Sequence, residues 1–113
     1  MIDFGASVLA ALTAAGLSPQ YAYPQDWQTA PVVSYWESRN VENEHADDNE
    51  LTSSVQYTID IWAKTPETTH AASAIANTAM QGLGFHRTAC YDLFETEAML
   101  HHRSMAFDLY KAI

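Results

Sequence analysis

The sequence predicts an α+β domain: a mostly antiparallel β-sheet of four to five strands, with two helices packed on one face and a long β-hairpin arm. Two observations predict this fold. Segments with apolar residues at helical spacing and segments that alternate with a period of two follow one another as helix, two or three strands, helix, two strands. In addition, the 113 residues fit one domain spanning 1–113, and 48% of them are hydrophobic, which is enough for a core.

The first helix is predicted over residues 3–15, with an apolar stripe that would face the core. Gly16 ends this helix where a left-handed cap costs least, and Pro19 keeps the chain from continuing as a helix. The stretch QYAYP that follows is interpreted as a short extended piece, and PQDWQTAP as a loop bounded by prolines. The stripe comprises Phe4, Val8, Leu12 and Ala15.

Two central strands follow, PVVSYWESRNV at 31–41 and TSSVQYTIDIWAKT at 52–65. The second alternates strictly, which predicts one face on the core and one face that is wetter or lies at an interface. The polar run VENEHADDNELTSS between them predicts a long β-hairpin with an acidic arm at about 40–53. In the second strand, the residues expected on the core face are Val55, Tyr57, Ile59 and Ile61, and those expected opposite are Gln56, Thr58, Asp60 and Trp62.

The second helix is predicted from both of its ends. Thr65 is the expected N-cap, Pro66 occupies the first helical position, and Gly84 provides the stop. Two further strands, FHRTACYDLFE and HHRSMAFDLYKAI, are joined by a turn near TEAMLH. The core side chains expected from these elements are Ala72, Ile75, Ala76, Ala79, Met80 and Leu83 in the helix, and Met105, Phe107 and Leu109 in the last strand.

The charge balance is strongly acidic, with 14 Asp and Glu against five Lys and Arg and a formal net charge of −9. Because neutralisation of phosphates dominates nucleic-acid affinity, direct binding of DNA or RNA is not expected. No apolar run approaches the roughly 20 residues of a membrane span, and the N-terminal segment lacks the basic cluster of a secretory signal. A single cysteine, Cys90, leaves no internal disulfide and indicates a reducing cytoplasm, or an assembly made there.

Histidines in the last two strands are the strongest candidates for a metal site. His101 and His102, with His86 on the neighbouring strand and acids nearby, are of the donor types that zinc or iron takes. Adjacent residues of a strand point to opposite faces, however, so His101 and His102 do not readily share one ion. A small metal-dependent enzyme using these histidines is the alternative from a different functional class. The nearby acids are Glu95, Glu97 and Asp108.

Other catalytic patterns are weaker still. Cys90 and His86 would lie on the same strand face, but no orienting acid or oxyanion hole accompanies them, and Cys90 is interpreted as a packing residue. The acidic run lacks the central glycine and flanking helices of a calcium loop. The four glycines form no phosphate-binding loop. The sequence therefore predicts no catalytic residues, no bound metal and no cofactor.

Aromatic residues gather on the two central strands, beside the acidic arm. Alternation places an aromatic on both faces of each strand, so some should reach the face away from the core. Exposed Tyr and Trp are typical anchors of protein interfaces, which favours an assembly protein over a monomeric enzyme. The candidate interface aromatics are Tyr35, Trp36 and Trp62.

Residues 31–110 resemble the tail completion, or tail terminator, proteins of long-tailed bacteriophages and prophages. The resemblance rests on degenerate motifs that occur together in a fixed order. They are a P-x-x-S-Y-x-E strand, a polar arm, a Y-T-I-D-I-W-A strand, a helix ending in M-Q-G-L-G-F-H-R, a Y-D-L-F-E strand and a final H-H-R-S-M-A-F strand. The arm is more acidic than the family pattern, and the first 30 residues match it only in having a helix.

The resemblance implies a structural, non-enzymatic virion protein, assembled in the host cytoplasm. It would form a homo-oligomeric ring, usually a hexamer, that caps the tail tube, ends tail polymerisation and joins the tail to the head-side connector. Its partners would be the tail tube protein and the connector protein. Another neck or tail-tube component of the same virion is the alternative within this class.

The resemblance implies a role for the acidic arm in the ring. DNA would pass through the lumen of such a ring without specific binding, and carboxylates there would repel its phosphates. The arm would therefore line the lumen or contact a neighbouring subunit, and both alternatives stay open. The arm acids are Glu42, Glu44, Asp47, Asp48 and Glu50.

Overall fold

The computed structural model describes residues 3–27, 31–44 and 51–112. Within these ranges the helices and strands follow in the predicted order, and the short piece after the first helix is a strand. In chain order the elements are α1 (Gly5–Ala14), β1 (Pro19–Tyr21), β2 (Val32–Glu44), β3 (Leu51–Ala63), α2 (Pro66–Gly82), β4 (His86–Glu95) and β5 (Leu100–Ala112).

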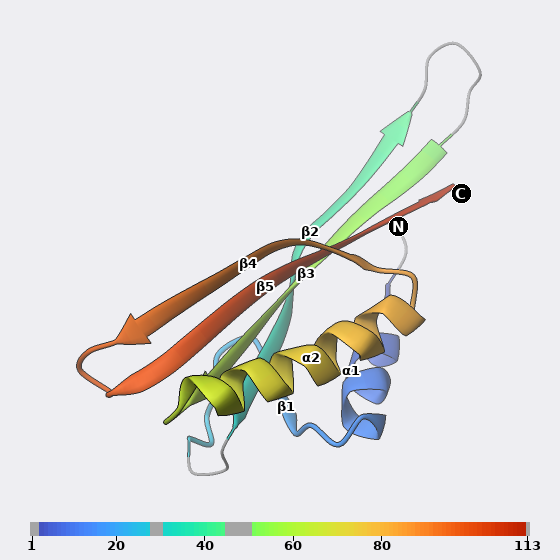
Figure 1. Cartoon of the computed structure of the whole chain (residues 1–113). Helices are drawn as coiled ribbons and strands as arrows, with labels where there is room; N and C mark the ends of the chain where they lie inside the picture. The colour runs from blue at the N-terminus through green and yellow to red at the C-terminus, as the bar shows by residue number, and fades with distance from the viewer. Residues whose placement is uncertain (1–2, 28–30, 45–50, 113) are drawn as a thin grey trace.

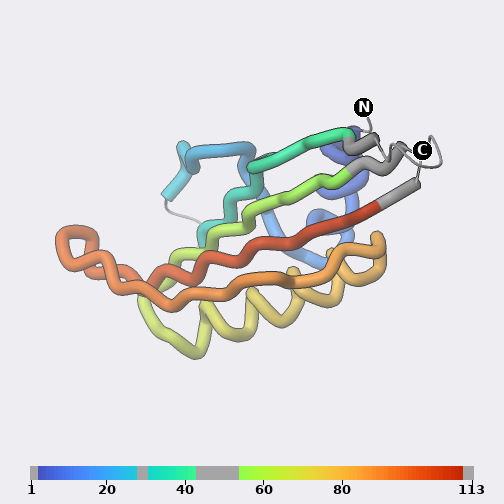
Figure 2. The backbone as a smooth tube through the Cα atoms, turned by 90° about the horizontal axis from the view of Figure 1, so that it is seen from above, coloured from blue at the N-terminus to red at the C-terminus, as the bar shows by residue number. Residues whose placement is uncertain are grey.

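The strands form one open sheet in the order β1-β2-β3-β5-β4. β1 runs parallel to β2, whereas the pairs β2–β3, β3–β5 and β4–β5 are antiparallel, so the predicted α+β fold with a mostly antiparallel sheet is confirmed. Both helices lie on one face of this sheet, as predicted (Figure 1). Figure 2 shows the strands side by side from above.

The core lies between the helices and the sheet face that they cover. The predicted core face of β3 is confirmed, because Val55, Tyr57, Ile59 and Ile61 are each at most 1% exposed. Phe107 of β5 is fully buried opposite Tyr57. Alternation along the strand places these side chains on one face, where the apolar sides of the helices cover them.

Both helices end as their sequences predict. The side chain of Thr65 accepts a hydrogen bond from the backbone N–H of Thr68 at 3.2 Å, so Thr65 caps α2 and satisfies one of its free N–H groups. Gly16 and Gly84 have φ angles of +95° and +97° just after α1 and α2. Such angles strain any residue with a Cβ atom, which explains glycine at both stops.

For one residue of α2, Ile75, the predicted place in the core is wrong. Ile75 is 42% exposed, because the helix turns a different stripe toward the sheet. Ile75 instead lies on the surface of the helix layer, in an apolar groove between α1 and α2 that is also lined by alanines of both helices. The helical period allows either placement for a residue at the edge of the stripe, so only packing decides. The buried residues of α2 are Thr69, Ala72, Ser73, Ala76 and Met80.

Two hairpins extend from the body at opposite ends of the sheet (Figure 1). The β2–β3 hairpin continues pairing to Glu44 and Leu51, and the β4–β5 hairpin turns through Thr96–Met99. A strand of 13 residues spans roughly 43 Å, so these strands account for the molecule's 52 Å long axis. No helix in the described ranges is long and apolar enough to cross a membrane.

Candidate functional site: the outer face of the sheet

The sheet face opposite the helices, here called the outer face, carries polar and aromatic side chains from four strands. Residues paired across antiparallel strands point to the same side, so their side chains form rows across the sheet. From the β4–β5 turn toward the arm, the rows are Val32–Trp62–His102–Leu93, Ser34–Asp60–Ser104–Tyr91, Trp36–Thr58–Ala106–Ala89 and Arg39–Gln56–Asp108–His86.

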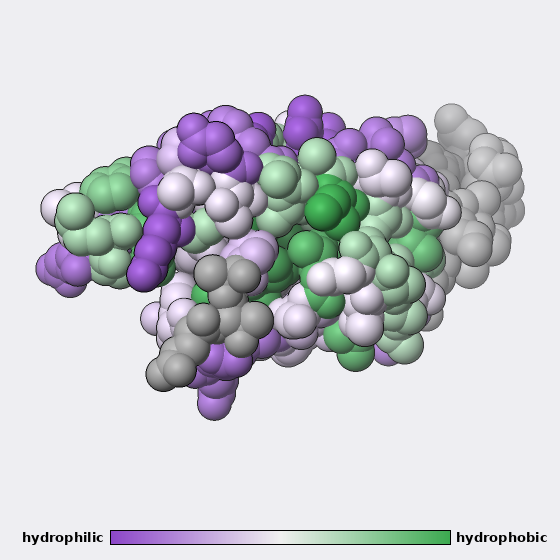
Figure 3. Space-filling view, turned by 60° about the horizontal axis from the view of Figure 1, so that its bottom comes forward, coloured by the Kyte–Doolittle hydropathy of each residue, from purple (hydrophilic) through white to green (hydrophobic). Residues whose placement is uncertain are grey.

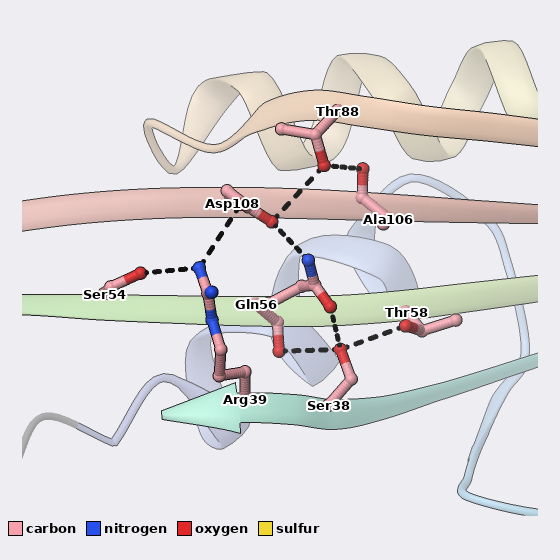
Figure 4. Close-up of polar contacts among 8 residues, drawn as sticks. All are labelled: Ser38, Arg39, Ser54, Gln56, Thr58, Thr88, Ala106 and Asp108. Carbon is pink, nitrogen blue, oxygen red and sulfur yellow. Dashed lines mark hydrogen bonds and ion pairs between the residues drawn. The ribbon is translucent and has the colours of Figure 1, made fainter. Parts of the chain in front are cut away.

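Asp108 is the centre of a polar network in the last of these rows (Figure 4). It is 6% exposed, yet Gln56 Nε2 donates to its Oδ1 at 2.9 Å and Arg39 Nη2 lies 3.7 Å from its Oδ2. Arg39 also donates to Ser54 Oγ at 2.9 Å. A buried carboxylate is costly unless it is paired and hydrogen-bonded, and these contacts supply both.

Two β-bulges complete the same network. The pairing register shifts between Glu37 and Arg39 in β2 and between Arg87 and Ala89 in β4, which leaves Ser38 and Thr88 as the extra residues. Both hydroxyls turn into the network: Ser38 Oγ donates to Gln56 Oε1 at 2.9 Å, and Thr88 Oγ1 lies 3.4 Å from Asp108 Oδ1.

Bulges increase the local twist of a sheet, bend the bulged strand and redirect its side chains. Here they fall on the two strands that flank the central β3–β5 pair, at the level where β2 and β3 leave the body as the arm (Figure 1). Asp108 and its partners therefore tie four strands together at the root of the arm.

The opposite end of the outer face is aromatic. The rings of Trp62 and His102 stack with centroids 4.4 Å apart and planes 22° apart, and Trp27 meets Trp62 edge-on at 5.1 Å. Trp62 Nε1 donates to Glu95 Oε1 at 3.1 Å. These contacts leave Trp62 only 8% exposed although it lies on the face away from the core.

His102 lies between two carboxylates from neighbouring strands. Its Nε2 is 2.8 Å from Asp60 Oδ1, and its Nδ1 is 2.9 Å from Glu95 Oε1. Burial of the ring lowers its pKa, but the hydrogen bond and charge of Asp60 and the charge of Glu95 outweigh burial and raise the pKa of His102 above its ordinary value. The group therefore holds a proton more firmly than a free histidine.

A hollow of about 340 Å³ opens on this aromatic end. Ser34 and Asp60 line it, and Ser34 is fully buried while its Oγ has no hydrogen-bond partner among the described residues. Buried hydroxyls are nearly always paired, so an unpaired one facing a hollow is unusual. The remaining lining residues are Ala22, Tyr23, Trp36, Trp62 and His102.

The three candidate interface aromatics have different surroundings. Tyr35 is 6% exposed and belongs to the core, where its ring meets Tyr21 edge-on at 5.3 Å. Trp62 is buried on the outer face, and Trp36 is 41% exposed there, at the rim of the hollow. Trp36 is thus the one of the three that offers substantial ring surface to a partner.

The candidate arm acids lie only partly within the described residues. Glu42 is exposed on β2, and Glu44 ends that strand. Asp47, Asp48 and Glu50 lie outside the described residues.

The structure separates the three histidines considered for a metal site. His86 pairs with Asp108, whereas His102 pairs with Trp62 six residues away along β5, a separation of roughly 20 Å. His101 points away from His102 and meets Phe94 with ring centroids 5.0 Å apart. Within the described ranges, no three His, Cys, Asp or Glu side chains are grouped to hold an ion.

The expectation that Cys90 and His86 share a strand face is wrong. His86 pairs with Asp108 on the outer face, but Cys90 pairs with Met105 on the core face. The bulge at Thr88 inserts one residue between them and reverses the alternation. Cys90 instead accepts a hydrogen bond from Arg103 Nε, with 2.9 Å between nitrogen and sulfur.

Sequence reasoning missed the exposed apolar surface outside the central strands. Leu93, Phe94 and Met99 of the β4–β5 hairpin are 53%, 48% and 66% exposed. Ile75 and Leu9 contribute further apolar surface on the helix side, where Figure 3 shows green patches over the middle of the molecule. The only sequence signal for the exposed apolar surface of this hairpin was that two apolar residues, Phe94 and Met99, lie close to a predicted turn.

Comparisons with known proteins give a fold. No protein-family model matches the sequence, and no curated protein matches it. Among solved structures, the chain is similar to a chain described as "Virion of native gene transfer agent (GTA) particle", with a TM-score of 0.65 and 18% sequence identity. The match covers 95% of this chain and 86% of that chain. At this identity the likeness shows that the two chains share a fold, and the role of the present chain has to be argued from its surfaces.

Proposed function

We propose that this chain is a structural, non-enzymatic subunit of a phage-like virion, and that it caps the tail tube as a ring and joins the tail to the head-side connector. The observation that carries the virion role is the fold shared with a chain of a gene transfer agent virion over 95% of this chain. The tail-capping role adds the resemblance of residues 31–110 to tail terminators.

The surfaces of the chain suit assembly into a ring. A ring of identical subunits uses two different patches that meet head to tail. The chain offers unlike surfaces at opposite ends, because the β4–β5 hairpin exposes Leu93, Phe94 and Met99 while the β2–β3 arm is acidic. Exposed apolar side chains that gather in this way mark interaction sites.

The acidic balance suits a channel for DNA. With a net charge of −9, a ring of these subunits repels phosphates and releases no counterions on contact, so DNA stays mobile. The arm acids, Glu42 and Glu44 among them, supply this charge if the arm lines the lumen. If the arm contacts a neighbouring subunit, they set the register of the ring instead.

The direct test is the size of the purified protein, alone and with its tail tube protein. A ring that binds the end of the tube and stops its growth supports tail capping. A ring that forms without stopping growth moves the chain to another neck or tail-tube role. A strict monomer that leaves tube growth unchanged contradicts both.

A second test separates the two placements of the arm. Deleting residues 41–50 should leave a folded subunit and impair ring formation or docking, and loss of the fold would assign the arm to the core. The matched variant keeps the arm but replaces Glu42, Glu44 and Glu50 by Gln and Asp47 and Asp48 by Asn. A lumen arm predicts normal rings that retain DNA, measured as slower DNA release, whereas an interface arm predicts a change in assembly itself.

A further inference from the structure

We propose that the hollow on the outer face is a binding site for a basic side chain, lysine or arginine, of a partner protein. The hollow combines aromatic walls with a carboxylate and the hydroxyl of Ser34, whose Oγ has no hydrogen-bond partner within the described ranges. Its occupant follows from the chemistry of these groups, so the inference does not depend on the tail-capping role.

The walls suit the stem and the charge of such a side chain. Trp36 and Tyr23 line the hollow and are 41% and 72% exposed, so their rings are available to a ligand. Aromatic faces attract cations, and the indole of tryptophan does so best. The aliphatic stem of lysine or arginine would lie along these rings while its charged end reaches inward.

The interior of the hollow suits a donor with positive charge. Asp60 lines it and uses Oδ1 for its contact with His102, so the second carboxylate oxygen is an acceptor for a ligand. Two carboxylates, Asp60 and Glu95, flank a single histidine, so the group is negative even when His102 is protonated. Ser34 Oγ would accept the remaining hydrogen bond.

Other occupants satisfy these groups less well. A purely apolar side chain would leave Ser34 Oγ and an oxygen of Asp60 buried without partners, which is unfavourable. An acidic side chain would meet Asp60 and Glu95 with like charge. The net charge of −9 also steers basic partners toward the chain.

The test is a titration of the full chain followed by NMR and tryptophan fluorescence, with Nα-acetyl-lysine methylamide as the probe and its norleucine analogue as the uncharged match. We expect the lysine probe to shift the indole signal of Trp36 and to bind at least about tenfold more tightly than norleucine, because it adds a charged hydrogen bond. Equal binding of both probes, or shifts confined to residues outside the hollow, overturns the proposal.

Two variants with matched controls locate the site. Trp36→Ala should weaken lysine binding about fivefold, while Tyr110→Ala, which removes an exposed aromatic elsewhere on the outer face, should not. Asp60→Asn should weaken it about tenfold, while Asp92→Asn removes the same charge from β4 without effect. Trp36 is exposed, so its variant tests the proposal even if Asp60→Asn does not fold. Equal losses in variant and control contradict the site.

The pH dependence supplies a further check on the charged groups that face His102, which are Asp60 from β3 and Glu95 from β4. As the pH rises and His102 loses its proton, the hollow becomes more negative, so lysine binding should tighten. In His102→Gln this tightening should vanish, and a binding curve that keeps its pH dependence in the variant contradicts the assignment of these groups to the site.

Discussion

The two faces of the sheet are built from the same strands and are stabilised in different ways. On the helix side, β3 contributes Val55, Tyr57, Ile59 and Ile61, all at most 1% exposed and packed against helices. On the outer face, Gln56, Thr58 and Asp60 of β3 are partly exposed and form hydrogen bonds, such as the contact between Gln56 and Asp108. Apolar burial is non-directional, whereas hydrogen bonds require specific partners at specific distances. Alternation alone therefore predicts which residues of β3 are buried on the helix side. For the outer face it predicts polar side chains, but not which of them form hydrogen bonds with one another.

The largest expected effect falls on the helix side. Phe107→Ala removes a fully buried ring and should lower the free energy of unfolding by about 3–5 kcal/mol, because it loses apolar burial and leaves a cavity. Urea denaturation followed by circular dichroism measures the loss. The matched control is Tyr110→Ala, three residues further along β5 and 65% exposed, which should change stability by about 0.5 kcal/mol or less. Similar losses in the two variants would mean that the faces do not differ as described.

A smaller but clear effect is expected from the network on the outer face. Asp108→Ala leaves Gln56 Nε2 without its acceptor and Arg39 without its counter-charge, and should cost roughly 1–3 kcal/mol. Asp108→Asn keeps an acceptor and should cost less. Asp92→Ala is the control, because the side chain of Asp92 is 60% exposed in its ion pairs with His70 and Arg103, and ion pairs open to solvent contribute little. A neutral Asp108→Ala would show that the network does not tie the strands together.

The same contrast explains which features the sequence could predict. Local periodicity and capping chemistry predict the order of elements, the helix caps and the core of β3, because each of these signals depends on only a few neighbouring residues. Asp60, Glu95 and His102 are brought together from three strands, and no local pattern signals such a meeting. The bulge at Thr88 had the opposite effect, because one extra residue reversed the alternation that placed Cys90 beside His86.

The next expected effect tests the aromatic end of the outer face through pH. The folded pKa of His102 is raised above its unfolded value, so its contribution to stability is fully present below the unfolded pKa and is lost as the pH rises through the folded pKa. The free energy of unfolding of the unaltered protein should therefore decline above about pH 6.5, and this decline should be absent in His102→Gln. His86→Gln, on the outer face away from these carboxylates, serves as the control. A decline that persists in His102→Gln and disappears in His86→Gln would contradict the pairing of His102 with Asp60 and Glu95.

The smallest expected effect compares two neighbours in sequence that point to opposite faces. Trp36 is 41% exposed on the outer face, so Trp36→Ala should change the free energy of unfolding by about 0.5 kcal/mol or less. Tyr35→Ala, one residue earlier, removes a ring that is 6% exposed in the core and should cost about 3 kcal/mol. Chemical denaturation of the two variants measures the difference directly. If Trp36→Ala proved as costly as Tyr35→Ala, its ring would be part of the fold rather than surface kept available for a partner, and the hollow beside it would lose its exposed wall.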